Sequence, residues 1–256
     1  MTTVSVDGLR ARYRARVALD GISLRMGAGV HGVLGPNGAG KTTLMRTLAT
    51  VIPPREGKVR LLGLDVSRRE NRTQVRRRLG YLPQTFGYYR GFTVAEFVEY
   101  IAWLKQMPKD RVPDAVDRAV ARVGLADRAG SKMKKLSGGM LRRAGIAQAI
   151  VNDPDVLLLD EPTAGLDPEQ RVEFRRLLRG IGATGTVIVA THLVEDVATA
   201  CTEVTLLDEG RLAFTGTPGQ LEDIGTSASG DATAGDSALE RGYSAALRTA
   251  RETAAA

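Results

Sequence analysis

The stretch GPNGAGKTT, at residues 35–43, decides how this 256-residue sequence is interpreted. Its glycines, lysine and threonine have the spacing of a phosphate-binding loop, in which backbone amides turn inward, the lysine supplies a cation and the hydroxyl ligates magnesium. An apolar run at residues 29–34 predicts a strand before the loop, and apolar residues at helical spacing predict a helix over 41–52. A glycine turn that arose by chance would not need a strand before it and a helix after it. We therefore expect a phosphate site here.

A second motif, VLLLDEP at residues 156–162, delivers two carboxylates to the end of an apolar run of buried-strand type. Ligands of open parallel sheets bind at the carboxyl ends of the strands. Asp160 suits a carboxylate that holds magnesium, and Glu161 suits a general base that takes a proton from an attacking water. A solvated strand end is the alternative, and the phosphate loop upstream argues against it.

Between these motifs, LSGGM at residues 136–140 precedes a helix predicted over residues 141–151. A serine and two glycines at a helix N-terminus form an anion site from backbone amides and a hydroxyl. The same residues also suit an ordinary helix cap. The residues alone leave both interpretations open.

Strands and helices alternate along the rest of the chain, which indicates a parallel sheet. Further helices are predicted over residues 97–104, 112–123 and 168–179, and short strands over 2–6, 21–26, 156–159 and 187–190. After Ile224 the composition changes to Gly, Ser, Ala, Thr and Asp. This predicts a linker and a loosely attached tail over residues 225–256, with a short helix over 239–250 that is marginal without packing.

The motifs follow one another in a definite order: GPNGAGKTT, YLPQ at residues 81–84, LSGGM, LLLDEP, AGLD at residues 164–167, and TH at residues 191–192. This ordered set resembles the ATP-binding-cassette ATPases over residues 35–192, with similar flanks to about Ile224. The resemblance implies an α/β fold: a P-loop NTPase with a RecA-like, mostly parallel sheet core, an N-terminal antiparallel β subdomain and a helical subdomain at about residues 87–152. It implies an ATPase domain over residues 1–224, followed by a low-complexity linker and C-terminal tail over 225–256.

The resemblance also implies roles for single residues. Gln84 resembles a glutamine that touches magnesium and the attacking water, and His192 resembles a switch histidine that contacts the terminal phosphate. Tyr13 resembles an aromatic residue that stacks on adenine, although an ordinary strand-end tyrosine is the alternative. The expected catalytic residues are Glu161, His192, Gln84 and Lys41, and the expected magnesium ligands are Thr42, Gln84 and Asp160. The residues expected to bind ATP are Tyr13, Gly35, Pro36, Asn37, Gly38, Ala39, Gly40, Lys41, Thr42, Thr43, Ser137, Gly138, Gly139 and Asp167.

Part of this set acts between two subunits in the family. Ser137 and Gly139 resemble signature residues that close over the nucleotide held by a second copy, and Asp167 resembles an aspartate that links the two sites. Met140 departs from the pattern, because the commonest family residue there is glutamine. Methionine lacks the hydrogen-bonding side chain, so Met140 is not expected to be a ligand.

The implied function is that of an ATP-hydrolysing subunit of a membrane transporter, which forms a dimer around two ATP and Mg²⁺. Residues 81–105 and LSGGMLRR look more like exporters of the drug- and antibiotic-resistance type than like importers. The alternative is a soluble ATPase of the family that acts on nucleic acid or ribosomes. Only 52 residues separate Gln84 from Ser137, which is too few for the coiled-coil insertion of the DNA-repair relatives. A catalytically dead binding module conflicts with the presence of Lys41, Asp160, Glu161 and His192 together.

Composition narrows the location and the partners. The longest apolar runs fall well short of the roughly 20 residues needed to cross a bilayer, and the first residues lack the apolar core of a secretory signal. We therefore expect a peripheral protein at the cytoplasmic face of the cell membrane, with the membrane-spanning permease supplied by another polypeptide.

The net charge of +7 is mostly local, because residues 68–78 hold six arginines and one glutamate. No aromatic residues interleave with these arginines, which favours a solvated helix face, so no nucleic acid partner is expected.

Aromatic residues are unevenly distributed, since eight of the twelve lie between Tyr81 and Trp103. Helical spacing favours core positions for Phe97, Tyr100, Trp103 and Leu104. No such periodicity explains burial of the aromatic residues directly after Gln84, and exposed aromatic clusters tend to mark protein interfaces. In the family this region receives a helix of the membrane subunit. We therefore expect the permease to dock near Phe86, Tyr88, Tyr89 and Phe92.

Overall fold

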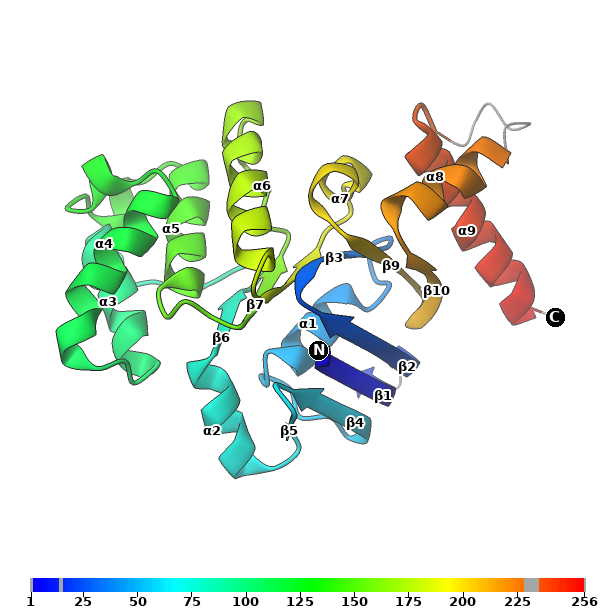
Figure 1. Ribbon diagram of the computed structural model, residues 1–256, viewed down its shortest axis with the longest axis horizontal. Coiled ribbons are helices and arrows are strands. Elements are labelled where there is room, and N and C mark those ends of the chain that lie inside the picture. The colour runs from blue at the N-terminus through cyan, green and yellow to red at the C-terminus, as the bar shows by residue number, and fades with distance from the viewer. Residues whose placement is uncertain (1, 14–15, 228–234, 256) are drawn as a thin grey trace.

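The computed structural model describes residues 2–13, 16–227 and 235–255 (Figure 1). Residues 228–234, in the middle of the predicted linker, lie outside this part of the chain. Two sheets and three groups of helices make up the fold. The helices α3, α4 and α5 lie at one end of the molecule, and α8 and α9 lie at the other (Figure 1).

The larger sheet is the structural base of the site. Its strand order is β10 (Arg211–Gly216), β9 (Glu203–Asp208), β3 (Gly29–Leu34), β8 (Thr186–Ala190), β7 (Val156–Asp160) and β6 (Leu79–Leu82). The pairs from β9 to β6 are parallel, and only β10 is antiparallel to its neighbour. Every residue of β7 and β8 is buried, as expected of parallel strands that are covered on both faces.

The smaller sheet is antiparallel and comes mostly from the N-terminal part of the chain. Its strand order is β2 (Arg16–Gly27), β1 (Thr2–Tyr13), β4 (Glu56–Leu61) and β5 (Leu64–Asp65). One apolar cluster joins this sheet to α1 (Lys41–Leu48) and to part of the larger sheet. The N-terminal antiparallel part of the predicted fold class is therefore present.

The remaining helices connect or cover the strands. They are α2 (Arg69–Arg77), α3 (Val94–Leu104), α4 (Val112–Arg122), α5 (Gly138–Ile150), α6 (Pro168–Gly182), α7 (Val194–Ala200), α8 (Pro218–Ser227) and α9 (Ala238–Ala255). Three short 3₁₀ turns lie at η1 (Lys109–Arg111), η2 (Ala126–Arg128) and η3 (Met133–Lys135). A capping box begins α3: Thr93 Oγ1 accepts from Glu96 N at 3.1 Å, and Glu96 Oε2 accepts from Thr93 N at 2.6 Å.

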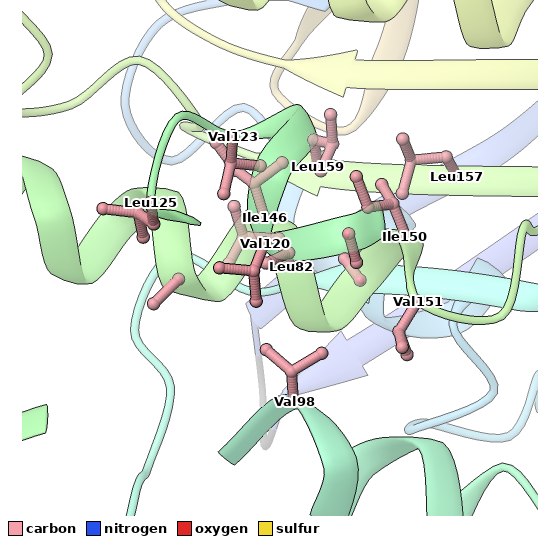
Figure 2. Close-up of a cluster of buried hydrophobic side chains, with 14 of the residues drawn as sticks. Leu82, Val98, Val120, Val123, Leu125, Ile146, Ile150, Val151, Leu157 and Leu159 are labelled. Atoms are coloured by element: carbon pink, nitrogen blue, oxygen red, sulfur yellow. The ribbon is translucent and has the colours of Figure 1, made fainter. Parts of the chain in front are cut away.

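The helical block is packed onto the larger sheet through one continuous apolar core. Figure 2 shows side chains from β6, β7, α3, α4, α5 and adjoining loops that meet there: Leu82, Val98, Val120, Val123, Leu125, Ile146, Ile150, Val151, Leu157 and Leu159. All of them are buried. Because burial of each such side chain contributes about 1.5–3 kcal/mol, this core holds the helical block in a definite position relative to the strand ends.

The predicted elements are present with shifted ends. The helix predicted over residues 41–52 ends at Leu48, because Thr50 adopts a left-handed conformation with φ 58°. The helix predicted over 141–151 begins earlier, at Gly138, because Ser137 caps it by accepting from Met140 N at 3.3 Å. The strands predicted over 2–6 and 21–26 extend to 2–13 and 16–27, since residues beyond the apolar patterns continue the antiparallel pairing.

The C-terminal segment differs from the loosely attached tail that its composition predicts. The predicted boundary at Ile224 lies inside α8, and α9 packs along α8. Apolar side chains of α8, α9 and β9 share a third core cluster, which includes Leu221, Leu239 and Ala246. The tail is thus attached by packing as far as its described residues extend, although the domain limits themselves remain a prediction.

One face of α3 also departs from expectation. Phe97 is buried, but Trp103 and Leu104 are 65% and 52% exposed. Val98 and Ala102 occupy the core face of the helix instead. The prediction that Trp103 and Leu104 belong to the core was therefore wrong, because both follow Ala102 around the last turn and so leave the buried side.

No helix among the described residues is both long and apolar enough for a membrane span.

Candidate functional site

Four neighbouring strands bring the sequence motifs to one edge of the larger sheet. The strands β3, β8, β7 and β6 are adjacent and parallel, so their carboxyl ends meet. The loop 35–43 follows β3, the pair 191–192 follows β8, Glu161 follows β7 and Gln84 follows β6. A cavity of about 400 Å³ lies there, lined by Ala18, Asn37, Gly38, Ala39, Gly40, Lys41, Thr42, Thr43, Gln84 and Glu161.

The loop 35–43 requires glycine at two of its positions. Gly35 has φ 156° and Gly40 has φ 106°, which are conformations that residues with a side chain rarely adopt. A Cβ atom at Gly35 would overlap the backbone oxygen of Leu207, and one at Gly40 would overlap that of Ala18. No side chain of the described residues caps α1 at Gly40, so the first amides of this helix remain available to an anion.

Lys41 begins α1 and extends back along the loop. Its ammonium donates to Gly35 O at 2.5 Å and to Pro36 O at 3.1 Å. The residue is only 7% exposed, and burial lowers the pKa of its side chain, while the charges of Glu161 and Asp160 act in the opposite direction. The loop therefore holds a cation over the cavity at the point where an anion would approach the α1 amides.

Asp160, the last residue of β7, carries a buried carboxylate. The residue is 1% exposed, and neither carboxylate oxygen has a hydrogen-bond partner among the described residues. Burial raises the pKa of this carboxyl, against the smaller opposing effects of the Thr42 hydroxyl, Arg142 and Lys41. Buried carboxylate oxygens without partners are costly, and a hydrated divalent cation would satisfy them. The residues present therefore fit a magnesium ion between Asp160 and Thr42.

Glu161 is turned toward His192. It has φ 51°, a left-handed conformation that is uncommon outside glycine, and its amide donates to Ala190 O at 2.8 Å. His192 Nδ1 lies 3.0 Å from both Glu161 Oε1 and Oε2, and Thr191 Oγ1 lies 3.4 Å from Oε2. The carboxylate at the cavity wall is thus oriented by two residues that follow the adjacent strand β8.

Arg142, on α5, is a site component that the sequence reasoning missed. Its buried guanidinium donates to Pro83 O and Gln84 O, both at 3.0 Å, and to Pro162 O at 3.3 Å. It also donates to Glu161 O at 2.6 Å and to Asp160 O. Burial lowers the pKa of Arg142, which the nearby carboxylates of Asp160 and Glu161 oppose. The signal available in the sequence was an arginine two residues before a helical run, residues 144–150, in which Gln148 is the one polar side chain.

The expected residues of the signature and of AGLD lie outside the cavity lining. Ser137 caps α5, and Asp167 caps α6 by accepting from Gln170 N at 2.9 Å. Gly139 packs closely on the loop before α6, since a Cβ there would lie 2.8 Å from Gly165 O. Within one copy of the chain, these residues are not brought together with Lys41 and Glu161. Both the cap and the shared-site interpretations remain compatible with this placement.

Tyr13 ends β1, and its side chain lies outside the part of the chain that the structure describes. Its predicted contact with adenine therefore stays a prediction.

The aromatic residues after Gln84 are unequally exposed. Tyr89 is 59% exposed, whereas Phe86, Tyr88 and Phe92 are half-buried against the core of the helical block. Phe86 packs on α5, where a Cβ at Gly145 would lie 2.6 Å from its ring. Of the expected docking residues, Tyr89 thus offers the largest free surface.

Comparison with known proteins gives consistent matches. The sequence model of a protein family described as "ABC transporter" matches residues 19–164. The "Daunorubicin resistance ATP-binding protein DrrA3" of Streptomyces coeruleorubidus is 38% identical over 86% of this chain and 70% of that protein. The "Nod factor export ATP-binding protein I" of Ralstonia nicotianae is 36% identical over 85% of this chain and 68% of that protein.

Solved structures match most of the arrangement of strands and helices. The structure of cbiO1 from Clostridium perfringens, described as part of the ABC transporter complex cbiONQ, has a TM-score of 0.75 and 30% identity over 86% of this chain and 90% of that one. A dimeric ATP-binding cassette bound to ADP and Pi has a TM-score of 0.78 over 84% of this chain and 98% of that one; its 24% identity speaks for the fold alone. The predicted fold class is confirmed by these matches.

Proposed function

Because the chain belongs to the ABC transporter family, as an ATP-binding subunit whose ATP hydrolysis powers transport, we propose that its cavity of about 400 Å³ is where ATP binds and is cleaved. The observation that carries the proposal is the convergence of four strand ends on that cavity. Lys41, Gln84 and Glu161 all line it, although they are far apart in the sequence.

The loop and α1 bind the phosphates. The amides at the start of α1 and the ammonium of Lys41 present positive charge on the same side of the cavity. On binding, Lys41 exchanges its contacts with the carbonyls of Gly35 and Pro36 for phosphate oxygens. The remaining members of the loop, from Pro36 to Thr43, position these donors, and Tyr13 stacks on the adenine.

Thr42, Gln84 and Asp160 hold the magnesium ion that accompanies ATP. The unpartnered carboxylate oxygens of Asp160 support this assignment. When bound, magnesium neutralises the negative charge that develops on the phosphate oxygens during transfer. Arg142 fixes the backbone of Gln84 relative to that of Asp160, and so keeps these two magnesium ligands at a constant distance from each other.

Glu161 acts as the general base. Its carboxylate lies at the cavity wall, where it accepts the proton of a water that attacks the terminal phosphate. His192, already 3.0 Å from that carboxylate, orients it and is positioned to contact the phosphate. Gln84, which follows the adjacent strand β6, orders the attacking water.

Two copies of the chain complete the site. Ser137, Gly138, Gly139 and Asp167 lie outside the cavity of their own chain, and we assign them to the nucleotide held by a second copy. A cap serine and the backbone amides at the start of α5 suit the far side of a triphosphate. The homodimer therefore encloses two ATP molecules.

A separate permease receives the conformational change that ATP hydrolysis drives. We assign its docking site to Phe86, Tyr88, Tyr89 and Phe92, which begin two residues after Gln84. The names of two relatives refer to drug resistance and to Nod factor export, which supports export as the direction of transport. The location that follows is the cytoplasmic face of the cell membrane.

The alternative, a soluble ATPase acting on nucleic acid or ribosomes, gains no support, because residues 85–136 form compact helices and turns.

The test of the proposed chemistry is Glu161→Gln. The variant keeps the shape of the side chain but cannot accept a proton, so ATP turnover should fall by about 10²–10⁴-fold while ATP binding is retained. Turnover and nucleotide binding would be measured on the purified chain and its permease. Glu222→Gln, which removes an exposed carboxylate from α8, should leave both unchanged. Turnover of Glu161→Gln at the parent rate would show that Glu161 is not the base.

The docking assignment has its own test. Tyr88→Ala combined with Tyr89→Ala removes two rings from the surface beside Gln84, and we expect the chain to lose co-purification with its membrane partner. Val172→Ala, which trims an exposed apolar side chain on α6, serves as the matched control. Unchanged association of the double variant, with ATP binding intact, would refute this docking site.

A further inference from the structure

The last turn of α3 exposes a large apolar surface. Trp103 and Leu104 are 65% and 52% exposed, while Phe97, Val98 and Ala102 of the same helix are buried. The buried face of α3 is therefore formed without Trp103 and Leu104. Large apolar side chains side by side on a surface mark an interaction site more often than single ones do.

Aromatic rings connect this turn to the segment after Gln84. The ring centroids of Tyr89 and Phe92 are 4.9 Å apart, those of Tyr89 and Tyr100 are 5.8 Å apart, and those of Tyr100 and Trp103 are 6.1 Å apart. We call these four residues the aromatic row. It starts within the docking segment that we assign to the permease and continues away from it along α3.

The arginine-rich helix α2 ends beside the last turn of α3. The ammonium of Lys105 donates to Arg76 O at 3.0 Å, and the guanidinium of Arg77 donates to Gln106 Oε1. The sequence pattern predicts arginines without aromatic companions, but the fold holds the segment directly after Trp103 against the end of α2. The exposed indole therefore lies two residues before Lys105, whose side chain contacts the arginine-rich helix.

The charge on this surface is largely available to an external partner. Arg69 and Arg77 are exposed, and the guanidinium of Arg77 contacts only the neutral amide of Gln106 among the interactions that the structure gives it. Arg78 differs, because it pairs with Asp155 at 2.8 Å. At the other end of the aromatic row, exposed Arg90, Lys134 and Lys135 flank Phe92, whose carbonyl accepts from Met133 N at 2.8 Å.

Acidic side chains on α3 do not cancel this charge. Glu96 already caps the helix and pairs with Lys132 at 3.5 Å, which leaves Glu99 as the second carboxylate of that helix. The exposed cations Arg69, Arg77, Arg90, Lys134 and Lys135 therefore outnumber the carboxylates Glu70, Glu96 and Glu99 of the elements that carry this surface.

We propose that the part of the aromatic row on α3, Tyr100 and Trp103, forms with Leu104 and the exposed arginines of α2 a surface that binds the anionic headgroups of a lipid membrane, with Trp103 and Leu104 entering the interface. Indole rings favour the boundary between headgroups and acyl chains, and guanidinium groups form paired hydrogen bonds with phosphate. The exposed leucine distinguishes this partner from nucleic acid, which offers it no apolar environment. This lipid contact adds to the permease contact of the proposed function and does not depend on it.

The chain contains a single tryptophan, so Trp103 reports on its own surroundings. The purified full-length chain would be titrated with vesicles of phosphatidylcholine alone and of phosphatidylcholine mixed with phosphatidylglycerol. We expect a blue shift of the tryptophan emission and quenching by brominated acyl chains with the anionic vesicles only, and weakening of both at high salt.

Two double variants separate the arginines of α2 from general charge. Arg69→Gln with Arg77→Gln should weaken binding to the anionic vesicles by about tenfold or more. The control Arg176→Gln with Arg179→Gln removes the same charge from exposed positions of α6 and should bind as the parent does. Equal weakening in both pairs would overturn the assignment to α2.

Other occupants of this surface are distinguishable outcomes. An absent shift with every vesicle, or an equal shift with neutral vesicles, would refute the proposal. The same shift with duplex DNA in place of vesicles would assign the surface to nucleic acid, and a shift seen only with the detergent-solubilised permease would assign it to protein. Because the vesicles contain no permease and the assay needs no ATP, these failures are distinct from failure of the proposed function.

Discussion

Arg142 shows how a single side chain can set the geometry of a phosphate site. Its guanidinium joins the backbone after β6, at Pro83 and Gln84, to the backbone at the end of β7, at Asp160 and Glu161. A planar group with five donors can satisfy several carbonyls at once, which an ammonium cannot. Arg142 thereby fixes the spacing between Gln84, to which we assign the ordering of water, and Asp160 and Glu161, to which we assign magnesium binding and proton acceptance.

Arg142→Met should therefore lower kcat more than it raises KM for ATP. The carbonyls that it satisfies belong to the catalytic segments, whereas the loop that binds the phosphates makes no contact with it in the interactions described above. Displacement of catalytic groups by about 1 Å can cost about 100-fold in rate, so we expect a decrease of that order. Steady-state ATP hydrolysis would measure both kcat and KM, and equilibrium binding would give the Kd for ATP.

The neighbouring arginine supplies the control. Arg143 donates to Val123 O at 3.3 Å and to Gly124 O at 2.9 Å, away from the cavity. Arg143→Met should keep kcat even if it lowers the thermal midpoint. Arg142→Lys, which retains charge but not the fork of donors, should recover part of the activity. Equal kcat in Arg142→Met and Arg143→Met would contradict a positioning role for Arg142.

At the scale of residues, the sequence predicted those residues of the candidate site that belong to short, continuous motifs. The loop residues around Lys41 and the pair Asp160 and Glu161 lie within short motifs at strand ends, and the structure places them at one edge of the sheet. Arg142 could not be predicted in this way. Its partners are 18 to 59 residues away, and only the tertiary fold brings them together.

At the scale of elements, the α8–α9 pair depends on glycine as well as on the apolar side chains of its core cluster. A Cβ at Gly242 of α9 would overlap Leu221 O of α8, and a Cβ at Gly225 of α8 would overlap Ala238 O of α9. The two helices thus approach each other at backbone distance. Arg251 adds a tie to the sheet, since its guanidinium donates to Asp208 Oδ2 at 2.6 Å.

Gly242→Ala should loosen α9. Alanine favours a helix over glycine by about 1 kcal/mol, but the added methyl meets a backbone oxygen that cannot move without moving α8, and overpacking costs about 1–3 kcal/mol. We expect faster hydrogen exchange of the amides in residues 238–255. Gly219→Ala, on the open side of α8, has no close neighbour and should not change the exchange. Unaltered protection in Gly242→Ala would contradict the close packing of α8 and α9.

Periodicity predicted the helices better than it predicted their surroundings. The ranges over α3, α4 and α6 were found within a few residues, because apolar spacing reports which face of a helix is buried. The packing of α9 was missed, because a segment rich in small residues has little apolar side-chain area with which to form a core. Its composition does not reveal that two helix backbones can approach each other closely at glycine. The exposure of Trp103 was missed for a related reason, since spacing cannot show which of two adjacent apolar faces is covered.

At the scale of the whole molecule, one copy of the chain holds only part of the residues that we assign to ATP. The cavity is lined by the loop 35–43, Gln84 and Glu161, whereas Ser137 and Asp167 cap the helices α5 and α6 outside it. The helical block, whose helix α5 is capped by Ser137, is packed on the larger sheet through one apolar core. We therefore assign closure over the nucleotide to the approach of a second copy.

The most direct test of this account is the mass of the Glu161→Gln variant in solution, measured by light scattering with and without ATP and Mg²⁺, together with its bound nucleotide. The account predicts monomers without ATP and, with ATP, a stable dimer that holds two uncleaved ATP molecules. A monomer that binds ATP with full occupancy would contradict it, because the caps at Ser137 and Asp167 would then have no nucleotide to close over.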